Sequence, residues 1–256
     1  MEQLSGRLKT VKTLPWWAHP CFSGGASLSA YQLRTISAWE MEESSGARSD
    51  SRGTNHLTDN NTVGSAAATS TNGGTAAVFV AASLESLSRA QGTISGIENK
   101  SGNFTIEMAI TLNSTGITQT IIAKGATSDT IPGFWCFVNS SNRFQITLGN
   151  GTSRVSVNPT NVLTTATLYH IVCTCDRSGN MSVYINNVLG TGTGAASIAG
   201  ITGNLGNTTP LTIGQTSSTT YANMKMDFIR FWDGLLDSTD RSYAYNSGNL
   251  RSFAQL

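Results

Sequence analysis

The chain has 256 residues, and its charge is both low and balanced. Sixteen Lys and Arg stand against 15 Asp and Glu, so only 12% of positions are charged, compared with about 25% in an average soluble domain. A net charge of +1 leaves no excess of cations to neutralise a phosphate backbone. The composition therefore argues against nucleic acid as a partner.

Small uncharged residues supply the polarity instead. Ser, Thr, Asn and Gly together make up 111 of the 256 residues, and 39% of the chain is hydrophobic. This mixture favours strands and tight turns over helices. No apolar run approaches the length of a membrane span, and residues 1–13 lack the apolar core and cleavage site of a signal peptide. We therefore expect synthesis in a cytoplasm and no membrane partner.

The four cysteines do not form a recognisable metal or disulfide pattern. Cys21, Cys136, Cys173 and Cys175 match no metal-binding spacing and are too few for a disulfide scaffold. Cys173 and Cys175 fall on one face of an expected strand, about 7 Å apart, which is too far for an unstrained disulfide. We expect reduced cysteines that pack.

Residues 1–34 differ from the rest of the chain. Trp16 and Trp17 lie between two prolines, which exclude a regular helix or a central strand. We interpret residues 1–34 as an extended N-terminal anchoring arm with an apolar patch at Trp16, Trp17 and Phe22. The patch either docks on a neighbouring chain or folds back on its own domain.

The domain over residues 35–256 reads as one short strand after another. Residues 104–112 alternate apolar with polar or small side chains, and residues 139–142 form a turn between two apolar segments. Asn186 and Asn187 suit a two-residue hairpin turn, because Asn tolerates a positive φ. This spacing predicts an all-β fold, a two-sheet antiparallel sandwich.

One short C-terminal helix interrupts this pattern. Asp237 or Ser238 can cap a helix that runs through Tyr245, with Gly248 just past its end. Most aromatic residues in the strand patterns are expected in the core: Phe104, Phe134, Trp135, Phe137, Phe144, Phe228, Phe231 and Trp232.

The order of several motifs points to a known family. An aromatic strand with acidic residues and a turn (residues 37–46) precedes an Asp-Ser-x-Gly-x-Asn loop (residues 50–55). A hairpin follows over residues 170–188, and residues 226–248 close the domain. Over residues 36–248 the chain resembles the laminin G-like, concanavalin A-like lectin/glucanase jelly roll, a fold often found in phage and bacterial surface proteins. This fold carries lectins, hydrolases and structural modules, so the resemblance leaves the function open.

The resemblance implies a structural Ca²⁺. Many members of the family hold this ion with an acidic loop near the start of the domain and an Asp near its end. The matching positions are Asp50 and Asn55 in the loop and Asp227 on a late strand. The competing interpretation is an Asx turn at Asp50 and a satisfied carboxylate at Asp227.

The best enzyme candidate is a pair of acids. Glu40 and Glu42 have the i, i+2 spacing of two glycosidase carboxylates on one strand face. Related β-glucanases, however, carry their acids on a concave middle strand with an additional Asp between them. No Gly-x-Ser-x-Gly elbow accompanies the three histidines. We therefore interpret the two acids as a solvated strand end and expect no enzymatic activity.

Sugar binding usually needs an exposed aromatic ring with Asn, Asp or Gln nearby. Tyr221, in a loop of residues 219–223, is the best candidate for glycan contact, with Asn223 beside it.

These observations favour a non-enzymatic virion structural protein of a tailed phage. It would be a capsid decoration or tail-associated adhesion module, fixed to other virion proteins by its arm and assembled as a homo-oligomer in the virion. The alternative is a carbohydrate-binding lectin module for host surface glycans; a glycoside hydrolase is least favoured.

Overall fold

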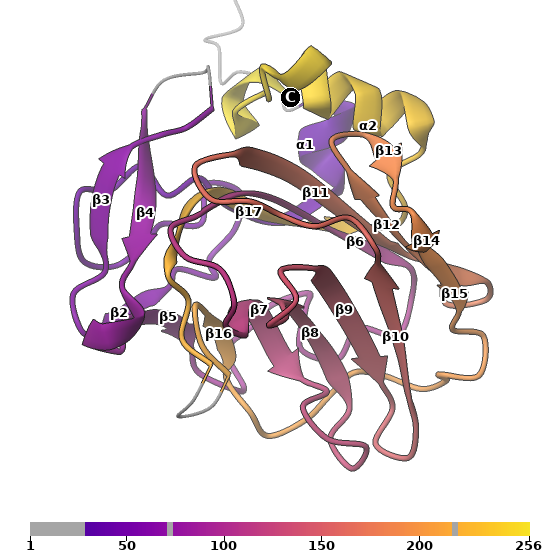
Figure 1. Cartoon of the computed structure of the whole chain (residues 1–256). Helices are drawn as coiled ribbons and strands as arrows, with labels where there is room; N and C mark the ends of the chain where they lie inside the picture. Colours follow the sequence, from indigo (N-terminus) through magenta and orange to yellow (C-terminus); the bar gives the residue numbers. More distant parts are fainter. Residues whose placement is uncertain (1–28, 71–73, 217–219) are drawn as a thin grey trace, which may run out of the picture.

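The computed structural model describes residues 29–70, 74–216 and 220–256 (Figure 1). The predicted anchoring residues Trp16, Trp17 and Phe22 lie outside the described residues, as does Cys21. No helix in the described part of the chain is long and apolar enough to cross a membrane.

The described residues form two antiparallel sheets, and the first of them has nine strands. They are β1 (Thr35–Trp39), β3 (Gly64–Ala67), β4 (Thr75–Phe79), β6 (Phe104–Leu112), β11 (Leu168–Cys175), β12 (Asn180–Ile185), β13 (Val188–Leu189), β15 (Ala195–Ser197) and β17 (Met224–Asp233). The spatial order is β13-β12-β11-β6-β17-β4-β3, with β1 also paired to β17 and β15 to β12.

The second sheet has eight strands. They are β2 (Thr58–Asn60), β5 (Ser86–Arg89), β7 (Gln119–Gly125), β8 (Gly133–Val138), β9 (Phe144–Gly149), β10 (Arg154–Pro159), β14 (Gly192–Thr193) and β16 (Leu211–Ile213). Their order is β14-β10-β9-β8-β7-β16-β5-β2. The two sheets face each other as layers (Figure 1), which confirms the predicted all-β, two-sheet jelly roll.

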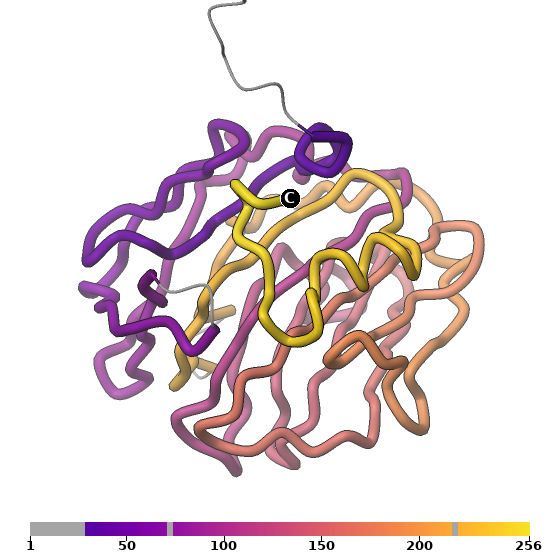
Figure 2. Tube along the Cα trace, turned by 90° about the horizontal axis from the view of Figure 1, so that it is seen from above, coloured from indigo at the N-terminus to yellow at the C-terminus, as the bar shows by residue number. Residues whose placement is uncertain are grey.

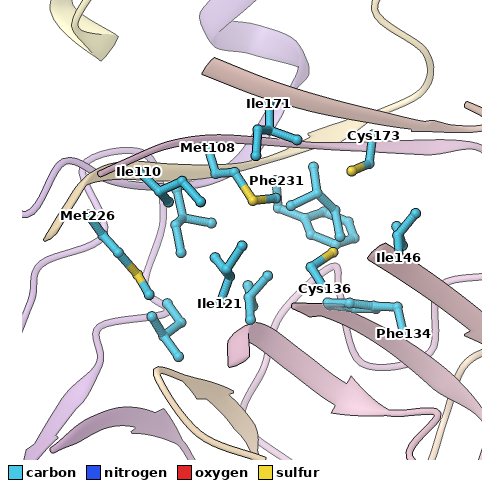
Figure 3. Close-up of a cluster of buried hydrophobic side chains, with 14 of the residues drawn as sticks. Met108, Ile110, Ile121, Phe134, Cys136, Ile146, Ile171, Cys173, Met226 and Phe231 are labelled. Atoms are coloured by element: carbon cyan, nitrogen blue, oxygen red, sulfur yellow. The ribbon is translucent and has the colours of Figure 1, made fainter. Parts of the chain in front are cut away.

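Alternating side chains from both sheets fill the core (Figure 3). Phe104 and Phe231 of the nine-stranded sheet stack with ring centroids 5.2 Å apart, and Phe134 of the other sheet packs against both. Cys136 and Cys173 meet here from opposite sheets as free, buried thiols. Burial raises the pKa of the Cys173 thiol well above its usual value, so it stays protonated and packs as a small apolar group.

Two α-helices and three 3₁₀ turns complete the described chain. They are α1 (Ala30–Arg34), η2 (Ala81–Ser83), α2 (Ser238–Tyr245), η3 (Asn246–Gly248) and η4 (Phe253–Gln255). The predicted C-terminal helix is confirmed as α2, and Asp237 caps it by accepting a hydrogen bond from the Asp240 N–H.

Helix α1 corrects the predicted boundary at residue 34. Its five residues fall inside the segment interpreted as an extended arm. Ser29 and Gln32 form a capping box, and the Gln32 side chain donates to the carbonyl of Phe253 at 2.8 Å. Tyr31 packs edge-on against Trp232. The helix therefore lies beside the C-terminal segment and belongs to the folded domain (Figure 2).

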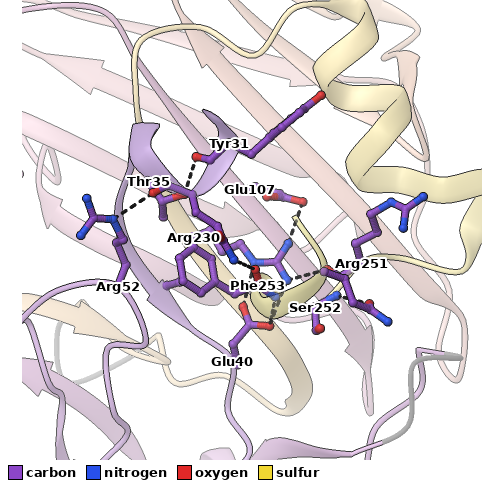
Figure 4. Close-up of polar contacts among 12 residues, drawn as sticks. Tyr31, Thr35, Glu40, Arg52, Glu107, Arg230, Arg251, Ser252 and Phe253 are labelled. Atoms are coloured by element: carbon purple, nitrogen blue, oxygen red, sulfur yellow. Dashed lines mark hydrogen bonds and ion pairs between the residues drawn. The ribbon is translucent and has the colours of Figure 1, made fainter. Parts of the chain in front are cut away.

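A buried ionic network attaches the C-terminal segment to the nine-stranded sheet (Figure 4). Arg230 donates to both carboxylate oxygens of Glu40, at 2.7 and 3.1 Å, and to Glu107 at 3.3 Å. It also donates to the carbonyl of Arg251 at 2.6 Å. The side chains of Arg230 and Glu107 are fully buried, so neither charge has water as a substitute partner.

The Glu107 carboxylate has two further side-chain partners, His170 and Trp232. Nε2 of His170 lies 2.9 Å from one oxygen, and Nε1 of Trp232 donates to the other at 3.0 Å. Burial alone raises the pKa of this carboxyl, but the Arg230 charge and the His170 contact outweigh it, so the pKa lies below its usual value.

Substitution Glu107→Gln should lower the free energy of unfolding by about 3 kcal/mol, because removing one partner of a buried pair leaves the other charge undercompensated. Urea unfolding measures the loss. Asp129→Asn is the matched control: Asp129 forms an ion pair with Arg154 but is 66% exposed, so its loss should cost less than about 1 kcal/mol. Equal effects of the two substitutions would contradict this account.

The same carboxylate predicts acid sensitivity. A carboxyl whose pKa is lowered by folding stabilises the protein above its unfolded pKa, about 4.3, and this contribution disappears as the pH falls through the folded pKa. Wild-type stability should therefore decline below about pH 4.5, and Glu107→Gln should show a shallower decline. Urea midpoints between pH 3 and 6 test this, with Asp129→Asn expected to follow the wild-type slope.

Candidate functional site

An uncharged cavity of about 700 Å³ opens where β8 meets the loops at one end of the sandwich. Trp135 comes from β8, and Tyr221 comes from the loop that precedes β17. The other lining residues are Ala81, Gly116, Ile117, Thr118, Ser140 and Thr220. None of these eight side chains carries a charge, so the cavity is suited to an uncharged ligand.

Strand alternation in β8 places Trp135 at this cavity. Phe134, Cys136 and Val138 point into the core between the sheets, so Trp135 and Phe137 face outward. The two outward rings stack with centroids 3.9 Å apart at 21°. Trp135 is only half-buried. The expectation that Trp135 belongs to the core is therefore wrong, because a run of five apolar residues in one strand places side chains on both faces of the sheet. Phe137 is buried as predicted, at 6% exposed, with its ring packed against Trp135.

The remaining aromatic residues divide in a similar way. Phe104, Phe134, Phe144 and Phe231 lie between the sheets, as predicted. Phe228 and Trp232 are buried on the outer face of the nine-stranded sheet, where they pack with residues of the C-terminal segment.

A chain of threonine hydroxyls holds the edge of the Trp135 cavity. The indole Nε1 of Trp135 donates to Oγ1 of Thr120 at 3.2 Å. That hydroxyl contacts Oγ1 of Thr220 at 3.1 Å, and Thr220 in turn contacts Thr216 at 2.7 Å. The Thr120 N–H also donates to the Thr220 carbonyl. These bonds fix the loop that carries Tyr221 next to the indole.

The structure separates the two residues predicted for glycan contact. Tyr221 lines the cavity, whereas Asn223 is not among its lining residues. The Asn223 N–H donates to Oε1 of Gln119 at 2.7 Å, and its carbonyl accepts from the N–H of Asn113. The Asn223 backbone thus anchors the loop.

The two candidate catalytic acids have structural partners. Strand β1 ends at Trp39, and Met41 has a φ of 58°, so Glu40 and Glu42 do not alternate on one strand as expected. Glu40 is held by Arg230 and also accepts from the N–H of Phe253 at 2.7 Å. The interpretation of Glu40 as a solvated strand end is therefore wrong, although Glu42 is exposed.

The three predicted calcium ligands do not share one set of contacts. The Asp50 carboxylate accepts from the N–H groups of Ala38, Arg52 and Asn55, at 2.9, 3.0 and 3.1 Å. The Asp227 carboxylate accepts instead from the N–H of Ser70 at 2.7 Å. Within the described ranges, no three His, Cys, Asp or Glu side chains gather as a metal-binding group. The Asp50 geometry matches the competing Asx-turn interpretation, and the calcium site stays a prediction.

The side chain of Asn55 also has partners within the protein. Its Nδ2 donates to Oγ of Ser37 at 2.7 Å and to the carbonyl of Ser95 at 2.9 Å. Its Oδ1 accepts from the N–H of Ser95 at 2.8 Å. Asn55 therefore ties its own loop to the segment that carries Ser95.

Substitution Asp50→Ala should lower the free energy of unfolding by about 3 kcal/mol, because three N–H groups lose a charged acceptor. If the role of Asp50 is confined to the backbone, melting temperatures in EDTA and in CaCl₂ should show the same deficit relative to wild type. A deficit that appears only in CaCl₂ would instead assign a bound calcium ion to this loop.

Comparisons with known proteins agree with this fold. The profile described as "Concanavalin A-like lectin/glucanases superfamily", a laminin G group, matches residues 89–240. A comparison with curated protein sequences found no significant match.

Solved structures with the same fold include toxin binding domains. The binding domain of Paraclostridial Mosquitocidal Protein 1 aligns with a TM-score of 0.64 and 13% identity, over 85% of this chain and 53% of that one. The botulinum neurotoxin serotype G binding domain gives 0.58 and 19%, over 82% and 50%. The botulinum neurotoxin DC binding domain in complex with SialylT gives 0.61 and 15%, over 85% and 52%. The chain thus spans about half the length of each of these domains.

The family match and the structure point to the same assignment. The matched region, residues 89–240, covers more than half of the chain and contains most strands of both sheets. The chain therefore belongs to the concanavalin A-like lectin/glucanases superfamily.

Proposed function

We propose that this chain is a carbohydrate-binding, lectin-like module that holds a neutral glycan in the Trp135 cavity. The observation that carries the proposal is the pairing of a half-buried Trp135 with Tyr221 in a cavity whose lining side chains carry no charge. Pockets of this kind combine apolar and aromatic surface with a few polar groups that orient the ligand.

Sugar chemistry fits these walls. A pyranose ring has an apolar face of C–H groups that packs on an aromatic ring, and its hydroxyls need donors and acceptors around the edge. The indole and the phenol can supply the stacking surface. Thr118, Ser140 and Thr220 line the same cavity, and each has a hydroxyl group of the kind that can bond sugar hydroxyls. Because no cation among the described residues lines it, the cavity favours an uncharged glycan over a sialylated one.

The comparisons support the class of function and leave the ligand open. The similar toxin structures are described as binding domains, and one was solved with SialylT. Since this chain aligns with only about half of each, their ligands do not transfer to it. The commitment of Glu40 to Arg230 also favours binding over glycan hydrolysis.

The role in a tailed-phage virion stays a prediction. It depends on the N-terminal arm, whose residues Trp16, Trp17 and Phe22 lie outside the described part of the chain. The homo-oligomer likewise stays a prediction. Deleting residues 1–25 and measuring incorporation into particles would test the virion role, and unchanged incorporation would contradict it.

A glycan array with neutral and sialylated glycans tests the lectin proposal. Trp135→Ala and Tyr221→Ala should each weaken binding to the best neutral glycan by about tenfold, about 1.4 kcal/mol, because each removes a stacking surface. Trp135→Phe, which keeps a smaller ring, should lose less.

Tyr243→Ala is the matched control. Tyr243 is an aromatic residue at the surface, 38% exposed, but it lies on α2, outside the cavity, so binding should be unchanged. The proposal is wrong if no glycan binds to wild type, or if binding survives both the Trp135→Ala and the Tyr221→Ala substitutions.

A further inference from the structure

A second cavity, of about 600 Å³, lies on the outer side of the nine-stranded sheet beside the C-terminal segment. It opens where β17 changes partners. Met224–Met226 pair with β4, whereas Ile229–Trp232 pair with β1. Asp227 lies between these two stretches and is the extra residue of a register shift against β6. Bulges of this kind re-aim a side chain and recur next to functional sites.

The bulge leaves the Asp227 carboxylate incompletely bonded at the cavity wall. Asp227 is 4% exposed. Its Oδ2 accepts from the N–H of Ser70, but its Oδ1 is buried and has no hydrogen-bond partner among the described residues. An unpaired carboxylate oxygen away from water is costly. A ligand that donates a hydrogen bond to Oδ1 would remove this cost.

The charges around the cavity leave a negative excess. Glu42 lines it and accepts a backbone hydrogen bond from Thr75 at 2.8 Å. Neither Glu42 nor Asp227 forms an ion pair with any described residue. Glu40 also lines the cavity, but Arg230 neutralises it. The charged groups that remain available to a ligand are therefore the carboxylates of Glu42 and Asp227.

One cation also lines the cavity, but its bonds hold it elsewhere. Arg251 donates from Nε to the carbonyl of Tyr243 at 3.0 Å, and its guanidinium lies 4.3 Å from the centroid of the Tyr243 ring. Apolar groups form much of the remaining wall, from Ala68, Phe228 and Phe253. The wall of this cavity thus combines free carboxylates with apolar side chains.

We propose that this cavity binds an alkylammonium group, as a free amine or a lysine side chain presents it, with the ammonium on Asp227 Oδ1 and the stem against the apolar wall. An ammonium has three N–H donors for Asp227 and Glu42. A calcium ion fits less well, because it needs six to eight oxygens and the described residues hold no cluster of three metal-binding side chains.

Calorimetric titration of the full chain with hexylammonium chloride and with acetyl-Gly-Lys-Gly-amide tests the proposal. Wild type should bind at least one of the two, and the tighter one identifies the source. Asp227→Asn keeps the shape and an acceptor for Ser70 but removes the charge, so binding should weaken at least about tenfold. Hexan-1-ol lacks the charge. Its affinity for wild type should therefore be no higher than the affinity of hexylammonium for the Asp227→Asn variant.

Asp176→Asn is the matched control. Like Asp227, Asp176 accepts a hydrogen bond from a backbone N–H, that of Ser178 at 3.1 Å. Asp176 does not line the cavity, so the Asp176→Asn variant should bind at the wild-type level. The proposal is overturned if wild type binds neither ammonium compound or if Asp227→Asn binds them equally well. It is also overturned if wild type binds CaCl₂ in preference to both and loses that binding in Asp227→Asn. Far-UV and near-UV circular dichroism of each variant keeps a folding defect distinct from lost binding.

Discussion

The arrangement of the outer layer depends on the burial of one guanidinium. Removing Arg230 from water has a large desolvation penalty, which only close and well-oriented partners can offset. Glu107 reaches it from β6, Glu40 from the end of β1, and a carbonyl from the C-terminal segment. Burial by itself lowers the pKa of Arg230, but the two carboxylates raise it above its usual value, so the charge is permanent. Three segments far apart in sequence must therefore keep one geometry.

This constraint separates the two sides of the sandwich. The C-terminal segment and α1 lie over the nine-stranded sheet (Figures 1 and 2). Trp232 and Phe228 are buried against residues of this covering layer. On the eight-stranded sheet, Trp135 stays half-exposed beside a cavity with uncharged walls. The chain itself thus covers much of the face that carries the buried charges and leaves the cavity beside Asp227 open. The aromatic surface that remains open belongs to the other sheet, which is why the glycan proposal rests there.

Local patterns predicted the fold because strand alternation and turn residues are properties of neighbouring positions. The hairpin at Asn186 and Asn187 and the cap at Asp237 are of this kind, and both are present. Glu40 shows where such patterns stop. Its partner Arg230 is 190 positions away, and nothing in the acidic stretch around Glu40 indicates a buried cation. Trp135 is different, because the alternation of Phe134, Cys136 and Val138 already contained the signal that its ring faces outward.

The low charge content makes each buried carboxylate informative. The chain has only 15 acidic residues among 256, so most buried positions hold other residue types. Each acid that is buried is therefore expected to have a specific structural or functional role. Glu107 has a cation, a histidine and an indole around it, and Asp50 has three backbone donors. Asp227 lines a cavity, and among the described residues its carboxylate has one donor and one unbonded oxygen. A fold that satisfies Glu107 and Asp50 so fully would gain stability from a neutral residue at this bulge, unless the Asp227 carboxylate serves a partner that the chain does not itself supply.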